Sequence, residues 1–227
     1  MGKWSADRLA ATSGALFVVL FLIAFFTATQ PPDSTDGNAE WVSYYLNHHR
    51  STLASGILIG VAVMTYAWFA GSVGAALRDA GERRLGLVAF GGGVATATTG
   101  LVLGGVAAAL SYGIALDSPS SVKAFVDVYL ALGALISFPI ALTIGASAIA
   151  AFRSGAFPRW WAWLSGAAAL VMISGGATLA HSGFYRPDGP WSFIVLIVFL
   201  AWTLLTSCWL AFKTLAQPVR EAAAAAG

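Results

Sequence analysis

The chain has 227 residues, of which 58% are hydrophobic and only 10% are charged, and its formal net charge is +2. Its mean hydropathy of +0.77 is too high for an ordinary soluble domain and is typical of a membrane protein. The small net charge, without a cluster of Lys and Arg side chains, excludes nucleic acid as a partner. The single cysteine, Cys208, excludes an intrachain disulfide and a cysteine-based metal site.

Six apolar segments are long enough to cross a hydrocarbon layer of about 30 Å as helices. The first follows Lys3 and Arg8; a cleaved signal peptide is the alternative, although its apolar region of about 20 residues exceeds the usual length of about 7 to 15. The predicted spans cover residues 9–28, 52–77, 86–112, 118–152, 160–181 and 191–212. We therefore predict an all-α polytopic bundle, with a six-helix transmembrane domain over residues 1–216 and a disordered alanine-rich tail over residues 217–227.

A short helix is predicted between the first two spans. Residues 30–38 contain prolines and a glycine and form a loop. Trp41, Tyr44, Tyr45 and His48 then fall at i, i+3, i+4 and i+7, which places them on one face of a helix over residues 39–50. This helix either lies in the membrane interface as an aromatic anchor or forms a lid over an outward-facing site.

Small side chains recur at every fourth position of the third and fourth spans. They form grooves in which another helix backbone can approach closely. The third span is therefore expected at the centre of the bundle, closely packed against the fourth, which Pro139 should kink. The packing positions are Gly92, Thr96, Gly100 and Gly104 in the third span, and Gly133, Ser137 and Gly145 in the fourth.

The distribution of basic residues predicts the orientation. Nine Lys and Arg residues lie on the side of the amino terminus, whereas Arg50, Lys123 and Arg186 lie on the other side. Because cytoplasmic loops carry the excess of basic residues, we expect both termini in the cytoplasm and the protein in a bacterial cytoplasmic membrane.

The predicted spans contain no ionisable residue in their apolar cores, which argues against a proton-coupled pump, a voltage sensor and haem ligation by facing histidines. The histidines are instead expected on the outer side, where Glu40 also lies. They could bind zinc or copper, or one could pair with a carboxylate as a base; alternatively they are simply solvated. The candidate outer-side ligands are His48, His49, Asp127, His181, Tyr185 and Arg186. No catalytic motif accompanies them, so no catalytic residue or cofactor is assigned.

Three features carry a resemblance: a first span followed by a long outer loop, the segment RDAGERR at residues 78–84, and the segment FPRWWAWLSG at residues 157–166. With these features the chain resembles the small six-span integral membrane proteins of high-GC bacteria that are grouped as domains of unknown function. The resemblance implies a six-span bundle and assigns no activity or functional residue.

Three functions are compatible with these features. The uncharged cores and small-residue grooves favour a non-enzymatic membrane protein that binds a lipid or hydrophobic small molecule, or an accessory subunit of a membrane complex. The first alternative is a facilitative transporter or channel with a polar path. The second is an outward-facing metal-binding protein or membrane enzyme, which requires the outer histidines and Asp127 to converge. The transporter path would be lined by groups such as Tyr66, Thr96, Thr99, Ser137 and Thr143.

Overall fold

The computed structural model of the chain describes residues 3–155 and 157–225, with side chains for residues 12–155 and 157–213. This described part is 84% helical and contains no strand, which confirms the all-α prediction. Four of its helical segments are long and apolar enough to cross a membrane, and they indicate a membrane protein. These segments are His49–Asp79, Arg83–Asp117, Pro119–Ser154 and Pro190–Lys213.

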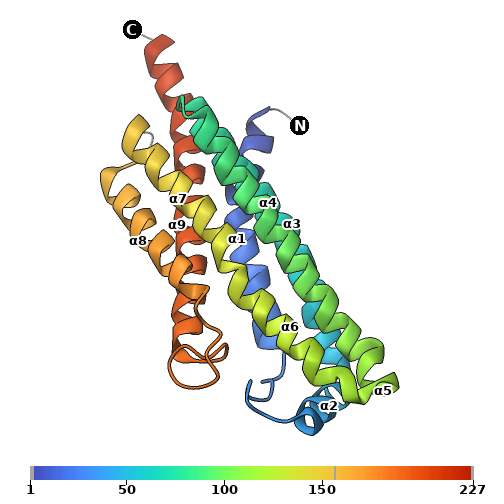
Figure 1. The fold of residues 1–227 in the computed structure, drawn as a ribbon. Helices are drawn as coiled ribbons and strands as arrows, with labels where there is room; N and C mark the ends of the chain where they lie inside the picture. Colours follow the sequence, from blue (N-terminus) through green and yellow to red (C-terminus); the bar gives the residue numbers. More distant parts are fainter. Residues whose placement is uncertain (1–2, 156, 226–227) are drawn as a thin grey trace.

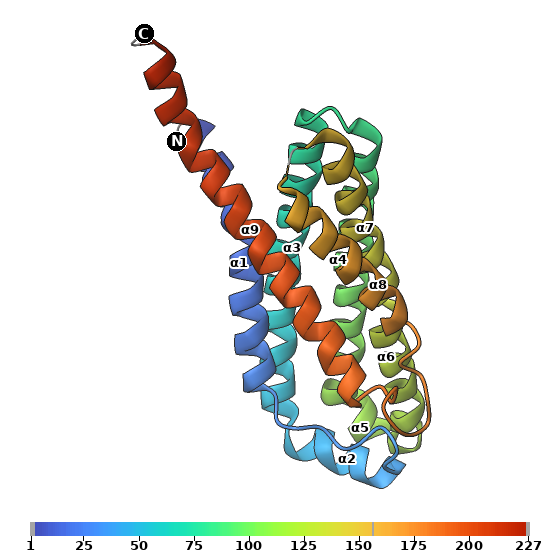
Figure 2. The ribbon, with the colours of Figure 1, turned by 90° about the vertical axis from the view of Figure 1, so that its left-hand side faces the viewer.

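Six helices of the described chain form a closed ring (Figures 1 and 2). Each packs against the next in the order α1, α3, α4, α7, α8 and α9, and α9 returns to α1. Their bounds are α1 (Lys3–Thr27), α3 (His49–Asp79), α4 (Arg83–Ala109), α7 (Ser137–Ser154), α8 (Arg159–Gly175) and α9 (Pro190–Ala225).

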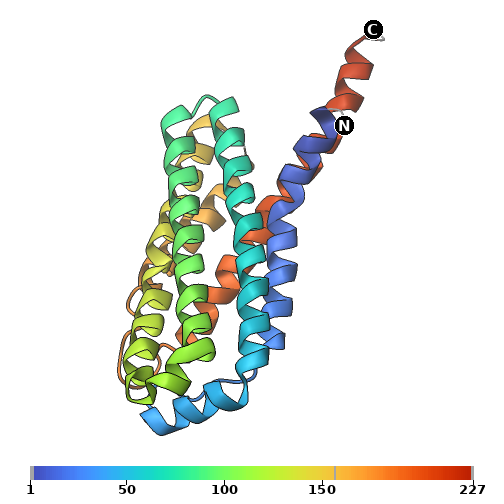
Figure 3. The same cartoon turned by 90° about the vertical axis from the view of Figure 1, so that its right-hand side faces the viewer.

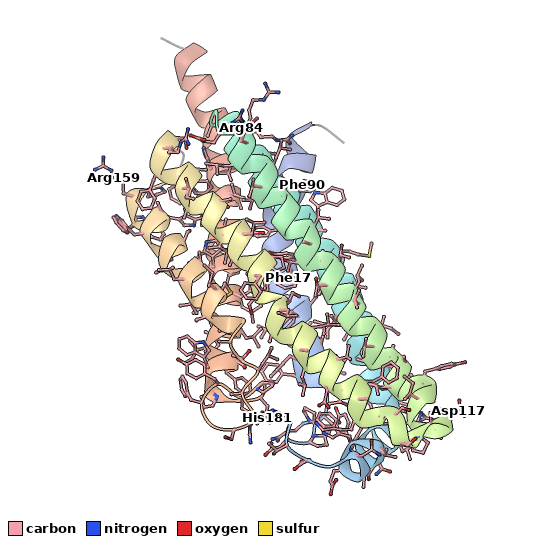
Figure 4. The ribbon with its side chains drawn as sticks, viewed as in Figure 1. Phe17, Arg84, Phe90, Asp117, Arg159 and His181 are labelled. Carbon is pink, nitrogen blue, oxygen red and sulfur yellow. The ribbon has the colours of Figure 1, made fainter. Side chains whose placement is uncertain are left out.

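The two ends of the ring differ in their connections. Both termini, the α3–α4 turn and the α7–α8 turn lie at one end, which we call the basic end (Figure 3). Figure 4 shows Arg84 and Arg159 there. The opposite end carries α2 (Asn38–Asn47), α5 (Ala115–Asp117) and the loop of residues 176–189, and we call it the α2 end. The loops predicted on the side of the amino terminus thus lie at one end of the ring, and the other predicted loops lie at the opposite end.

Aromatic side chains fill the interior of the ring. Tyr66 lies at its centre, with its ring centroid 5.0 Å from that of Phe17 and 5.4 Å from that of Phe199. Phe69, Trp161 and Trp202 continue the same core and are almost completely buried. Among the described side chains, the buried ones include Ser and Thr, and none is Asp, Glu, Lys, Arg or His. The ring therefore has an uncharged, closely filled core.

The outer surface of the ring is apolar. Trp68, Leu170 and Ile197 are each more than 60% exposed, and Phe90 projects outward where Phe17 points into the ring (Figure 4). A surface of this kind is suited to hydrocarbon rather than water.

The small-residue stripe of α4 is shared between two neighbouring helices. A Cβ atom added to Gly92 would lie 2.6 Å from Thr143 Oγ1 of α7, whereas one added to Gly100 would lie 2.9 Å from Val63 of α3. A step of four residues turns a helix by about 40° beyond a full circle, so the stripe winds from one partner to the other. Thr96 is buried on the stripe, and Gly104 lies near the Gly56 carbonyl.

The expected close packing of the third span against the fourth is found where Gly92 of α4 meets Pro139 and Thr143 of α7. The most extensive helix contact is that between α3 and α4. It uses a seven-residue spacing of Gly86, Gly93 and Gly100, because seven residues complete almost two helical turns. A Cβ atom at Gly86 would lie 2.7 Å from the Gly74 carbonyl oxygen of α3, so the two backbones approach closely there.

The fourth span is broken where its proline predicts. The helix α6 (Val122–Leu135) ends four residues before Pro139, and α7 begins at Ser137. Pro139 has no N–H to donate to the Leu135 carbonyl and its ring would clash with that group, which accounts for the interruption of the helix at Ile136. Two of the predicted packing residues of this span, Ser137 and Gly145, face α8. The third, Gly133, is exposed and has no atom near its added Cβ position, so its assignment as a packing residue is wrong.

Three element ends differ from the predictions. The fifth helix, α8, ends at Gly175 instead of continuing to residue 181, because paired glycines at 175 and 176 weaken the helix. The third span continues past Tyr112 through the π-helix η1 (Leu110–Ile114) into α5. The helix α9 continues to Ala225, beyond the predicted end of the sixth span at residue 212, since alanine is the strongest helix former.

Candidate functional site

The helix α2 lies across the α2 end of the ring (Figure 2). Its first turn carries Glu40, whose negative charge is favourable at a helix N-terminus. Trp41 and Tyr45, one turn apart, are each 4% exposed and pack against Leu110 and Val122 in a second apolar cluster. A short aromatic helix is thus present as predicted, but it ends at Asn47 instead of residue 50, so His48 follows it and His49 begins α3.

An open groove separates α2 from the preceding loop. It has a volume of about 660 Å³. The loop contributes Gln30, Pro31 and Pro32, and α2 together with the residue after it contributes Ala39, Glu40, Ser43, Tyr44, Asn47 and His48. A volume of this size is within the range of about 300 to 1,000 Å³ that is typical of small-molecule sites.

Hydrogen bonds fix the wall of the groove that Tyr44 and His48 form. The Tyr44 hydroxyl donates to the Thr29 carbonyl oxygen at 2.9 Å, and His48 Nδ1 lies 3.4 Å from Thr29 Oγ1. The Tyr44 and His48 rings pack with their centroids 5.3 Å apart. Burial raises the pKa of Tyr44, with the Thr52 hydroxyl opposing it, so the Tyr44 side chain is neutral and acts as a donor.

The Glu40 carboxylate has no ion-pair or hydrogen-bond partner among the described residues. Two other acids at this end are paired: Asp127 lies 2.7 Å from Lys123 Nζ, and Asp33 lies 3.6 Å from Arg186. The groove therefore combines one unpaired carboxylate, one imidazole and one aromatic wall.

A second polar cluster holds the loops of the α2 end together, and we call it the loop clasp: Ser34, Lys123, Arg186 and Asp188. The backbone N–H and hydroxyl of Ser34 donate to Asp188 at 3.0 and 2.8 Å, and Arg186 Nε lies 2.6 Å from Asp188. Lys123 Nζ donates to the Ser34 carbonyl at 2.9 Å. Partial burial raises the pKa of Asp188, but the Ser34 hydrogen bonds and Arg186 together hold it below its ordinary value.

The structure separates the candidate outer-side ligands. His48 lines the groove, whereas Arg186 belongs to the loop clasp and Asp127 pairs with Lys123. Tyr185 packs on neighbouring aromatic rings, and His49 and His181 are exposed, with His181 on the loop after α8 (Figure 4). No group of three or more His, Cys, Asp or Glu residues that could hold a metal ion occurs in the described part of the chain. The convergence that the metal hypothesis requires is therefore not found there.

Sequence reasoning did not find most of the groove. Gln30, the two prolines, Ser43 and Asn47 were not predicted to share a site with His48. The available signal was a rigid Pro31-Pro32 pair in the loop that precedes a short helix, which predicts a loop but not the side of the helix that it faces.

A buried polar group also lies inside the ring. Tyr66 Oη is buried and makes no hydrogen bond of ordinary geometry with the described residues, although the Thr96 and Thr143 hydroxyls are polar neighbours. Those two hydroxyls donate to carbonyls of their own helices, Gly92 at 2.9 Å and Pro139 at 3.1 Å.

The chain matches no protein-family model, no curated protein and no solved structure.

Proposed function

We propose that the chain is a non-enzymatic integral membrane protein that binds a lipid or hydrophobic small molecule, or that serves as an accessory subunit of a membrane complex. The observation that carries this proposal is the core of the ring, in which none of the buried side chains described is Asp, Glu, Lys, Arg or His. Enzymes and ion-coupled pumps place ionisable groups beside their reactants or ions, and an intramembrane charge is tolerated mainly where it is used. The proposed membrane is the cytoplasmic membrane of a bacterium, in keeping with the resemblance to small six-span proteins.

The six-span topology, with both termini in the cytoplasm, is part of this proposal. Four spans have the necessary length and hydropathy, and α1 and α8 are the two that complete the count. The 25 residues of α1 extend about 37 Å, whereas the 17 residues of α8 extend about 25 Å and need the following loop to reach the surface. Their positions in the ring, antiparallel to their neighbours, support both as spans (Figure 1).

Cysteine labelling tests the topology. In a Cys208→Ala background, the S182C variant is expected to react with a membrane-impermeant maleimide in intact cells, because residue 182 follows α8 on the outer side. The D79C variant, at the end of α3, should react only after permeabilisation. Both side chains are exposed, so access does not limit labelling. Labelling of the two positions from the same side would show that α8 does not cross the membrane.

Native mass spectrometry with elemental analysis tests the binding function. The detergent-purified protein is expected to carry a lipid, another hydrophobic molecule or a partner subunit, and to be free of stoichiometric metal. Stoichiometric zinc, copper or iron that is lost in His48→Ala or His181→Ala variants would contradict the proposal and would favour an outer metal site.

One observation favours a facilitative transporter as the second candidate. Tyr66, Thr96 and Thr143 form a polar position within the core, where such a path would need one. Of the other proposed lining groups, Ser137 is buried beside Gly175 and Thr99 is half-buried. The aromatic rings of Phe17 and Phe199 pack directly on Tyr66, so the path is interrupted, and we rank this function second.

A further inference from the structure

We propose that the groove between α2 and its preceding loop binds an organic ammonium group, with the Glu40 carboxylate as its counter-ion and Tyr44 as its aromatic wall. This inference names a ligand class for the proposed binding function, and it rests on that function. The ammonium group could belong to a lipid headgroup or to a free solute, since both present the same charge and the same methyl or methylene surface.

The charge of the groove selects a cation. Residues 28–47 contain three acidic residues and no Lys or Arg. Two of the three acids are engaged: Asp33 is paired with Arg186, and Asp36 accepts a hydrogen bond from the Asp33 backbone N–H at 2.8 Å. Only Glu40 both lines the groove and is without a partner in the described part of the chain. No Lys or Arg side chain lines the groove, so an anionic ligand would meet no fixed positive charge there.

Glu40 lies exposed at the N-terminus of α2, beside the groove. It lies in the first turn of α2, and its Oε2 atom is 2.9 Å from where a Cβ atom of Gly37, the N-cap residue, would stand. The N-terminus of a helix favours negative charge, which stabilises the ionised carboxylate beside the groove. The charge is thus held in place and remains available to a ligand.

The size and walls of the groove select an organic cation over a metal ion. A volume of about 660 Å³ is far larger than a bare ion requires, and the described residues contain no metal-ligand cluster. The Tyr44 ring is held by the hydrogen bond of its hydroxyl to Thr29, and aromatic rings attract ammonium groups by cation–π interaction. Pro31 and Pro32 add rigid apolar surface for methyl or methylene groups.

Choline binding to the protein in phosphatidylglycerol nanodiscs tests the free-solute source, since this lipid has no ammonium group. The dissociation constant is expected to rise at least tenfold in Glu40→Gln. His48→Arg, which places a fixed positive charge in the groove, should have a similar effect. Asp117→Asn is the matched control, because Asp117 is an exposed acid at the same end but outside the groove (Figure 4), and it should leave binding unchanged.

Native mass spectrometry in mixed lipids tests the headgroup source. Preferential retention of phosphatidylethanolamine or phosphatidylcholine over phosphatidylglycerol, lost in Glu40→Gln, would support the inference with a lipid as the ligand. Thermal melting of each variant would establish that it is folded. The inference would be overturned if Glu40→Gln changed neither the binding of choline nor the retention of the ammonium lipids. Tighter binding of phosphatidylglycerol than of the ammonium lipids by the wild type would also overturn it. A protein that retains another hydrophobic molecule despite that result would leave the proposed function standing.

Discussion

A Gly93→Val variant is expected to lose much of its stability, because residue 93 lies where α4 meets α3 without space for a side chain. A Cβ atom at Gly93 would overlap the Ala70 Cβ atom, which is fixed to the backbone of α3 and cannot rotate away. The helices must therefore separate along the most extensive contact of the ring. Overpacking of a filled interior typically costs about 1 to 3 kcal/mol of stability. We expect the cost of Gly93→Val to be at the upper end of this range or above it.

The Gly91-Gly92-Gly93 sequence supplies its own control. Gly91 has no atom near its added Cβ position, whereas Gly92 would meet Thr143 Oγ1 and the Pro139 carbonyl of α7. Gly91→Ala should keep or raise the melting temperature, since alanine is better than glycine in a helix by about 1 kcal/mol. In detergent, Gly93→Val should melt roughly 10 °C below the wild type, as about 3 kcal/mol implies for a chain of this size. Equal effects at positions 91 and 93 would show that α4 does not face α3 in this register.

The helical class and the apolar segments were predictable because they depend on local sequence. Runs of apolar residues with few charges determine where helices can cross a membrane, and Pro139 determines a kink through the hydrogen bond that it cannot make. The partner of each helix face depends instead on the relative rotation and crossing of helices distant in the chain. The four-residue stripe of α4 therefore revealed a close-packing surface but not that Gly92 faces α7 while Gly100 faces α3.

The candidate site was less predictable than the fold. The sequence places the histidines at the same end of the bundle, but an end of a six-helix ring is wide enough to keep His48 and His181 on different elements. Asp127 and Arg186 were attractive as ligands because they are charged, and each is instead engaged by a neighbouring charged side chain. Both of these pairings are local, since Lys123 lies one helical turn before Asp127 and Asp188 lies two residues after Arg186. The contacts of Arg186 and Asp188 with Asp33 and Ser34 join segments far apart in sequence, and no local pattern reports those. The unpaired state of Glu40 becomes visible only when the partners of its neighbours Asp33 and Asp36 are known.

A Trp202→Ala variant is expected to weaken the closure of the ring. Trp202 of α9 is 2% exposed, and its ring packs between Phe69 of α3 and Trp161 of α8, with centroid distances of 6.1 and 6.0 Å. Its indole N–H donates to the Ser165 hydroxyl of α8 at 2.9 Å. One side chain thus joins three helices of the ring, and its removal leaves a cavity that none of them can fill without moving.

The free-energy cost of this cavity comes from lost packing contacts. Lipid tails are as apolar as the core, so burial of the Trp202 side chain away from lipid contributes no hydrophobic transfer free energy that the substitution could remove. We expect about 3 kcal/mol for Trp202→Ala, at the lower end of the range for Trp in water-soluble cores. Ser165→Ala, which removes only the hydrogen bond, should cost about 1 kcal/mol. Trp68→Ala is the matched control: Trp68 is 66% exposed on the outer face of α3 and should change stability little. Denaturation in mixed micelles followed by circular dichroism would measure all three. A similar loss for Trp68→Ala and Trp202→Ala would contradict an interior held by packing, since only Trp202 lies within it.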